Sequence, residues 1–210
     1  MNQHTLIQQT SLALQAMKQN AALRQQLSDH GFSPRQIRDG VQLLEASQEI
    51  ITSGHEAARQ LRKATLSLQQ TRTYIHERYV QHLLIARQLF AQDPETSHAL
   101  GLHQKRQQAE EHWLRQANVF YQQAPLHAEI LQKHDISLSE LEETRILVGQ
   151  MRELWSLKRQ LQSRIQNTAR AERSTFLRLE NWYRHLTEQA RKALKNYPWH
   201  LEALGLTVIR

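Results

Sequence analysis

Apolar residues recur at steps of three, four and seven along two long stretches of the chain, at residues 37–90 and 147–194. This spacing places the apolar side chains on one face of an α-helix, where they can pack against a neighbouring helix. No proline interrupts either stretch before Pro94 and Pro198. The pattern therefore predicts two long helices of about 60 residues, each about 90 Å long at a rise of 1.5 Å per residue.

The two stretches belong to an ungapped internal repeat with an offset of 104 residues. With this shift Pro94 lies on Pro198, and the run Ala99-Leu100-Gly101-Leu102 lies on Ala203-Leu204-Gly205-Leu206. Each proline is typical of the first residue of a short helix, and Gly101 and Gly205 are placed to end these helices in the left-handed conformation. A duplication of one unit explains why the same residues that begin and end a helix occur twice.

The start of each long helix is marked by a different set of residues that play the same parts. Ser33 is a candidate N-cap, and Gln36, three residues on, can close a capping box. Ser137 and Glu140 occupy the same two places in the second half. Apolar residues flank both boxes at the positions of a hydrophobic staple, namely Phe32 with Ile37 and Ile136 with Leu141.

One segment leaves two alternatives open for the first long helix. Ser53-Gly54-His55-Glu56 has the form of a capping box and could begin a new helix after a turn. Its counterpart in the second half, Leu157-Lys158-Arg159-Gln160, contains no helix breaker. If the two halves share a fold, Gly54 is a kink or a tolerated glycine within one continuous helix.

These observations predict an all-α fold, an elongated antiparallel helical bundle or coiled coil built from two copies of a helical unit of about 104 residues related by a pseudo-twofold axis. Residues 1–103 form the first repeat and residues 104–210 the second, packed as one structural domain. The capped long helix and the closing Pro-x₅-Leu-Gly-Leu at residues 94–102 and 198–206 resemble those of a group of bacterial all-helical proteins with two tandem copies of such a unit. No activity is known for that group, so the resemblance bears on the fold alone.

The composition agrees with a helical chain and limits the cellular compartments in which the protein is expected. Only six glycines and four prolines occur among 210 residues, and there is no cysteine. Disulfides and thiolate chemistry are thereby excluded. The start of the chain lacks the features of a signal peptide, and no apolar run approaches the ~20 residues of a membrane span. We therefore expect a cytoplasmic protein with no membrane span.

The chain offers no recognisable constellation for catalysis, a cofactor or a metal. Twelve histidines are present, yet the one Glu-x-x-His pair, Glu95 with His98, follows Pro94 in a short segment. His30 and His134 each precede a helix end, where an imidazolium complements the helix dipole. We therefore expect no catalytic, cofactor-binding or metal-ligating residues.

The charge is the more informative property. The net charge is +7, and residues 145–195 hold twelve basic residues against four acidic ones. Arg145, Arg152, Arg159 and Arg173 fall at multiples of seven along one side of the second long helix. This stripe could follow the phosphates of a nucleic acid, or it could be a solvated flank that faces acidic residues on a neighbouring helix. The aromatic residues Trp155, Trp182 and Tyr183 lie on or near the apolar face and are expected in the core.

Every repeated feature is a cap, a staple or an apolar seam position, and none is a reactive group. The sequence therefore favours a non-enzymatic helical scaffold or protein-interaction protein, whose partner is a second copy of the chain or another helical protein. The alternative is a nucleic-acid-binding protein that uses the basic face of residues 145–195. A weaker alternative is a helical bundle that binds a metal or a small ligand.

Overall fold

The computed structural model describes residues 2–105, 107 and 109–207. It confirms the all-α fold, with 85% of the residues helical and no strand in the described part of the chain. The helices are α1 (Gln3–Gln19), α2 (Ala21–Asp29), α3 (Pro34–Leu89), α4 (Pro94–Ala99), α5 (Glu110–Gln123), the 3₁₀ helix η1 (Ala124–His127), α6 (Ala128–Gln132), α7 (Leu138–Ala193) and α8 (Pro198–Ala203).

The chain divides into two compact units that do not follow the order of the sequence. Unit 1 comprises Met1–Ala58 and Arg164–Arg210, and unit 2 comprises Arg59–Ser163. Helices α3 and α7 each supply one stretch to unit 1 and the other to unit 2. The long helix α3 continues through Ser53-Gly54, so this segment does not begin a new helix. A Cβ added at Gly54 would lie 3.4 Å from the Cγ2 of Thr168, so the helix has room for a side chain here.

The predicted caps form at the starts of both long helices, but in two different ways. At α3 the backbone N–H of Ser33 donates to the Gln36 Oε1 at 2.6 Å, and the Gln36 N–H donates to the Ser33 Oγ at 3.4 Å. This is the reciprocal capping box. At α7 the Glu140 N–H donates to the Ser137 Oγ at 3.2 Å, but the Glu140 carboxylate is directed to His82 instead.

The short helices α4 and α8 end as the glycines predict. Gly101 and Gly205 have φ angles of +68° and +74°. The N–H of Leu102 reaches the carbonyl of Ser97, and the N–H of Leu206 reaches that of Leu201, both at 2.9 Å. These are the long-range bonds of the Schellman motif, which satisfies the last carbonyls of a helix.

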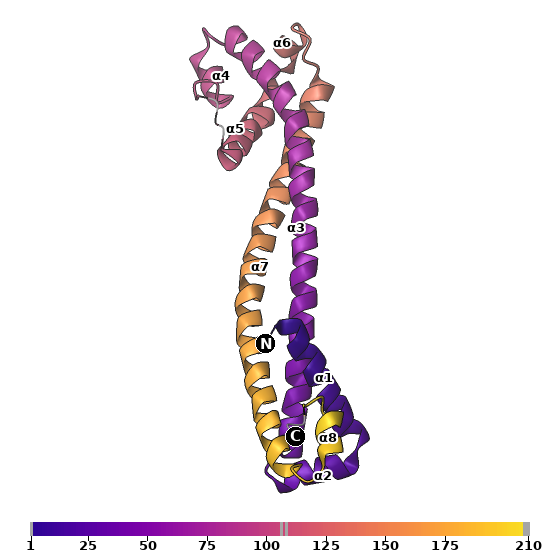
Figure 1. Cartoon of the computed structure of the whole chain (residues 1–210). Helices are drawn as coiled ribbons and strands as arrows, with labels where there is room; N and C mark the ends of the chain where they lie inside the picture. Colours follow the sequence, from indigo (N-terminus) through magenta and orange to yellow (C-terminus); the bar gives the residue numbers. More distant parts are fainter. Residues whose placement is uncertain (1, 106, 108, 208–210) are drawn as a thin grey trace. The chain divides into compact units, whose positions relative to one another are not determined.

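In unit 1 the helices α1, α2 and α8 gather around the first turns of α3 and the last turns of α7 (Figure 1). Trp182 of α7 anchors this core, because its Nε1 donates to the backbone carbonyl of Gln36 at 2.7 Å and its ring meets Phe32 edge to face at 5.9 Å. A Cβ at Gly40 would lie 2.2 Å from the Trp182 ring. Gly40 therefore makes room for the indole. Trp182 and Tyr183 are only 8% and 9% exposed, which confirms their place in the core.

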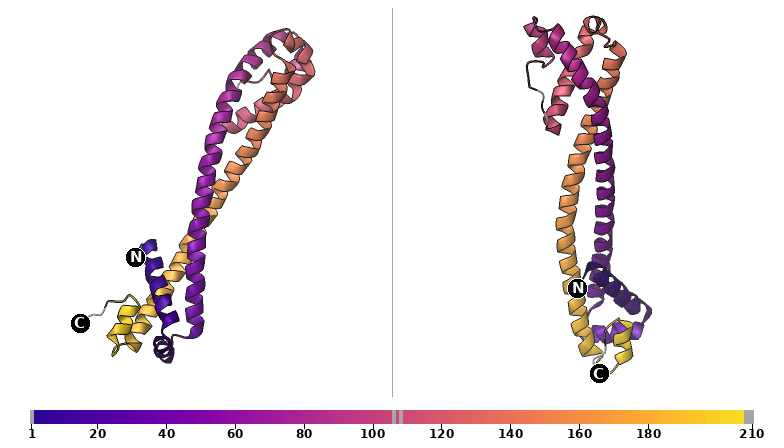
Figure 2. Two further views of the ribbon diagram at one scale, coloured as in Figure 1. Left: turned by 90° about the vertical axis from the view of Figure 1, so that its right-hand side faces the viewer. Right: turned by 45° about the horizontal axis from the view of Figure 1, so that its top comes forward.

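In unit 2 the helix α5 lies against the last turns of α3 and the first turns of α7 (Figure 2). Aromatic side chains dominate this core. Tyr79 of α3 makes edge-to-face contacts with Trp113 and Phe120 of α5, with ring centroids 6.1 and 5.6 Å apart. All three side chains are fully buried, so α5 is attached to α3 by a layer of interlocked rings.

Among the described residues no helix combines the length and the apolar character that a membrane span requires.

Candidate functional site

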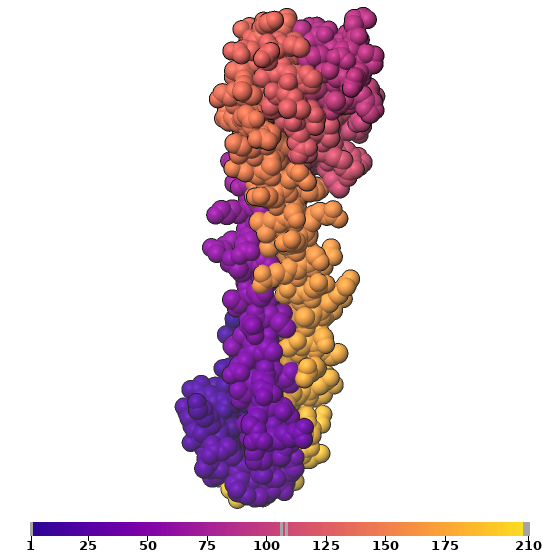
Figure 3. All heavy atoms as spheres, turned by 180° about the vertical axis from the view of Figure 1, so that it is seen from behind, coloured from indigo at the N-terminus to yellow at the C-terminus, as the bar shows by residue number. Residues whose placement is uncertain are grey.

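Unit 1 contains an open apolar groove between α1, α2 and α3, with a volume of about 1030 Å³. Figure 3 shows the side of unit 1 on which the indigo atoms of α1 and α2 lie beside the purple atoms of α3. The apolar lining comes from two helices, with Leu14 and Met17 on α1 and Ile37, Val41 and Leu44 on α3. The last three residues are four and three positions apart and so form a continuous ridge on one face of α3.

Val41 is the member of this ridge that departs from the sequence prediction. The apolar spacing places Val41 in the packed seam, yet 39% of the residue is exposed. Neighbouring seam positions Ile37 and Leu44 are half-buried and pack against the core of unit 1. The sequence carries no signal for this groove, because the apolar spacing does not show which neighbour covers each seam position.

The wall of the groove is held in place where α1 ends and α2 begins. The N–H of Asn20 donates to the Ala16 carbonyl, which ends α1, while its Oδ1 accepts from the Leu23 N–H at 3.0 Å and caps α2. Arg24 donates from Nη1 to the carbonyls of Met17 and Lys18 at 2.7 and 2.8 Å. These bonds satisfy the last carbonyls of α1 and fix the corner between α1 and α2.

The rim of the groove is polar and carries both signs of charge. Lys18 lies on the α1 side and Glu45 on the α3 side. An apolar floor between a cationic and an anionic rim residue suits a segment with one apolar face and charged flanks. The groove holds no grouping of side chains that points to chemistry on a bound substrate.

A second feature, in unit 2, is a buried polar network that connects α3, α5 and α7. His82 of α3 lies with its Nδ1 3.1 Å from the Tyr121 hydroxyl and its Nε2 3.3 Å from the Glu140 carboxylate. A carboxylate can only accept a hydrogen bond, so Nε2 carries the proton and Nδ1 accepts from the tyrosine. The network borders an open groove of about 460 Å³ that is also lined by His134 and Asp135.

Burial determines the titration of this network. Loss of solvent lowers the pKa of His82 below its ordinary value of 6.5, although Glu140 opposes the shift. Burial also raises the pKa of Tyr121, with Tyr79 and Glu140 adding to the effect. The network is therefore held with a neutral imidazole and a neutral phenol, and its role is to join three helices.

At the surface of the same unit, an arginine lies between two carboxylates. Arg78 lies 3.0 Å from Glu143 and 3.8 Å from Glu140, and its guanidinium covers the ring of Tyr74 at 4.3 Å. The hydrogen bond from Arg78 lowers the pKa of Glu143. These contacts are structural, since both carboxylates are engaged with cations or hydrogen-bond donors.

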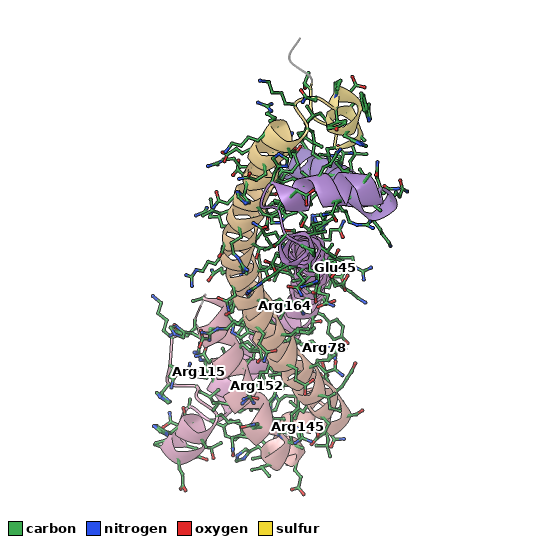
Figure 4. All side chains as sticks on the ribbon, turned by 90° about the horizontal axis from the view of Figure 1, so that it is seen from below. Glu45, Arg78, Arg115, Arg145, Arg152 and Arg164 are labelled. Atoms are coloured by element: carbon green, nitrogen blue, oxygen red, sulfur yellow. The ribbon has the colours of Figure 1, made fainter. Side chains whose placement is uncertain are left out.

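The four arginines predicted as an anion-binding stripe all lie on α7 with exposed side chains. Arg145 is paired with Glu142 at 2.6 Å, and Arg152 donates to Asn118 of α5 at 3.3 Å. Figure 4 labels both arginines. Arg145, Arg152 and Arg159 belong to unit 2 and Arg173 to unit 1, so no single unit contains the whole set.

The histidines take up separate local positions. The Nδ1 of His30 lies 2.9 Å from the Gln26 carbonyl at the end of α2, the place expected of a histidine that complements a helix C-terminus. His98 and His103 stack with ring centroids 4.6 Å apart. Within the described residues there is no group of three or more histidine or acidic side chains that could hold a metal ion.

The chain matches no protein-family model, and comparisons with curated proteins and with solved structures likewise find no match.

Proposed function

We propose that the protein is a non-enzymatic helical scaffold that binds an amphipathic helix of a partner protein in the groove between α1, α2 and α3. The observation that supports this function is the ridge of the exposed Val41 and the half-buried Ile37 and Leu44, which lines one groove with Leu14 and Met17. A helix recognises such a groove through apolar residues at i, i+3, i+4 and i+7. The rim residues Lys18 and Glu45 would then pair with charges beside the apolar face of the partner.

The proposal includes the two-copy organisation of the scaffold, with residues 1–103 and 104–210 as copies related by a pseudo-twofold axis and with α3 and α7 antiparallel. Its support is the agreement of boundaries: α3 and α7 both have 56 residues, and α4 and α8 both have six. The residues of positive φ also fall in pairs 104 positions apart, Gly31 with Asp135 and Gly101 with Gly205. Each compact unit would then combine one end of each long helix.

Unit 1 and unit 2 differ at the positions that line the groove, which favours a role in partner binding for unit 1 alone. With the offset of 104 residues, Val41 and Gln48 correspond to Arg145 and Arg152. Arg145 and Arg152 contact Glu142 and Asn118 in unit 2. The apolar ridge with the exposed valine is therefore a property of unit 1, and a helix that docks by an apolar face is expected there.

Site-specific photo-crosslinking in cells that express the protein tests this function. A photoreactive phenylalanine analogue at position 41 is expected to crosslink an amphipathic helix of one defined partner protein. A Leu44→Glu substitution should abolish that product because it places a charge on the groove floor. The matched control is the same analogue at Ile146, an apolar residue of α7 that is 58% exposed. The function is wrong if position 41 gives the same products as position 146, or if the crosslinks survive Leu44→Glu.

A further inference from the structure

The stretch of α7 in unit 1 carries a row of exposed arginines on its outer face. Arg170, Arg173 and Arg184 are separated by three and eleven residues, spacings that return to the same side of a helix. All three side chains are exposed to solvent. Continued to Arg191, the row is about 31 Å long at 1.5 Å per residue.

The acidic residues of this stretch neutralise only part of its positive charge, although Glu188 is exposed on the same face between Arg184 and Arg191. Residues 164–193 hold seven basic and three acidic side chains. Of the three, Glu172 accepts a hydrogen bond from Gln3 of α1 at 2.9 Å and Glu180 has a partner of its own. Lys192 and Lys195 are both exposed and extend the positive charge to the end of α7. The outer face of α7 in unit 1 therefore carries an excess of positive charge.

Two exposed aromatic residues follow the end of α7 in the sequence. Tyr197 and Trp199 meet edge to face, with centroids 5.5 Å apart and an angle of 87° between the rings. Tyr197 is 39% exposed and Trp199 is 58% exposed. The indole is the largest aromatic side chain in proteins and is normally well covered, so an exposed tryptophan that follows a run of basic residues in the chain indicates a binding surface.

Tyr197 stands at the repeat position of Asp93 but does not cap its helix with a side-chain hydrogen bond. Asp93 is the N-cap of α4, and its Oδ1 accepts from the Thr96 N–H at 3.0 Å. Tyr197 is the N-cap of α8 and makes no side-chain cap hydrogen bond. Aspartate is among the best N-cap residues and tyrosine is not. Local stability therefore does not explain Tyr197, whereas a binding surface does.

We propose that the outer face of α7 in unit 1, together with Tyr197 and Trp199, binds single-stranded nucleic acid. The arginine row would contact successive phosphates, and the two rings would stack on bases that leave the row, as in proteins that bind single strands without sequence preference. A linear polyanion fits a row of charges that ends in rings. An anionic membrane surface fits less well, because insertion needs a continuous apolar face. Leu201, the apolar residue between the rings and the helix end, is only 8% exposed and faces the core.

Fluorescence anisotropy with the purified full chain tests this proposal. The probe is a fluorescein-labelled 20-nucleotide oligothymidylate, titrated at 50 and 200 mM NaCl. Contact with about four phosphates predicts a slope near −2.8 for log K against log salt, and so a loss of about fiftyfold between the two salt concentrations. A duplex of the same length is expected to bind more weakly, since its bases are already stacked on each other.

Two sets of variants separate the charges from the rings. The triple variant Arg170→Gln/Arg173→Gln/Arg184→Gln should weaken binding and reduce the steepness of the salt dependence by about 0.7 for each phosphate that the variant no longer neutralises. Trp199→Ala should weaken binding about tenfold and leave the salt dependence unchanged, because stacking is not ionic. Arg145→Gln is the matched charge control, since Arg145 is exposed on the same helix and paired with Glu142. Tyr74→Ala is the aromatic control, with a ring that is 42% exposed and covered by Arg78.

The proposal is overturned if no binding is detected at 50 mM NaCl with 100 μM protein, or if the control variants lose as much affinity as the test variants. Binding to vesicles of phosphatidylserine and phosphatidylcholine without binding to the oligonucleotide overturns it as well. Circular dichroism of each variant shows that the helices are intact. The substituted side chains are exposed, so the variants are expected to retain the fold.

Discussion

Replacement of Gly40 by alanine is expected to destabilise the protein, although the same change inside a helix is normally stabilising. Alanine favours an α-helix over glycine by about 1 kcal/mol. At Gly40, however, the new Cβ would lie 2.2, 2.3 and 2.8 Å from three atoms of the Trp182 ring. The indole must move, which costs about 1–3 kcal/mol in packing and about 1 kcal/mol for the hydrogen bond from Nε1 to the Gln36 carbonyl. The net expectation is a loss of about 1–3 kcal/mol.

The matched control is Gly149→Ala, in the interior of the other long helix. No atom lies within 4 Å of a Cβ built at Gly149, so this substitution should stabilise the chain by up to about 1 kcal/mol. Urea unfolding followed by circular dichroism at 222 nm measures both effects, and a double variant with Trp182→Leu should recover part of the loss at Gly40. If Gly40→Ala stabilises the protein as much as Gly149→Ala does, the packing of Trp182 against α3 is wrong.

Two further predictions concern a buried histidine and the two N-caps. Since burial lowers the folded-state pKa of His82 below 6.5, the unfolded chain binds a proton at a higher pH than the folded chain does. Stability should therefore be complete above pH 6.5 and decrease as the pH falls below it. His82→Gln should reduce this dependence, and urea midpoints at pH 7.5 and 5.0 test this expectation. Asp93→Ala should lower the urea midpoint because α4 loses its cap, and Tyr197→Asp should raise stability by about 0.5–1 kcal/mol because α8 gains one. Unchanged midpoints in both cap variants would contradict the assignment of the caps.

The positions at which the helices begin and end could be derived from the sequence because their signals are local. Ser33 and Gln36 cap α3 as predicted, and Gly101 and Gly205 end α4 and α8 with positive φ. In each case the interacting groups are within five residues of one another. Such a motif needs only the backbone of one helix turn, so its residue types predict its geometry. The all-α class follows from the same information together with the apolar spacing.

Other features could not be read in this way because they depend on residues distant in the chain. Glu140 has the sequence of a capping-box residue like Gln36, yet its carboxylate is directed to His82 of another helix. Val41 has the spacing of a seam residue, yet it lines the groove because α1 and α2 leave it uncovered. The periodicity of a helix predicts which face is apolar but does not predict which neighbour covers each turn of it.

The sequence by itself determined the all-α class, the starts and ends of α3, α4, α7 and α8, and the excess of positive charge in the second half of the chain. Only the tertiary structure decided which apolar and charged side chains remain open to a partner. Trp182 and Gln36 are 146 residues apart in the chain and share a hydrogen bond, while Trp199 is 58% exposed. The physical reason is that burial and pairing belong to contacts between helices, and these contacts are set by the packing of the whole unit rather than by the few residues around each side chain.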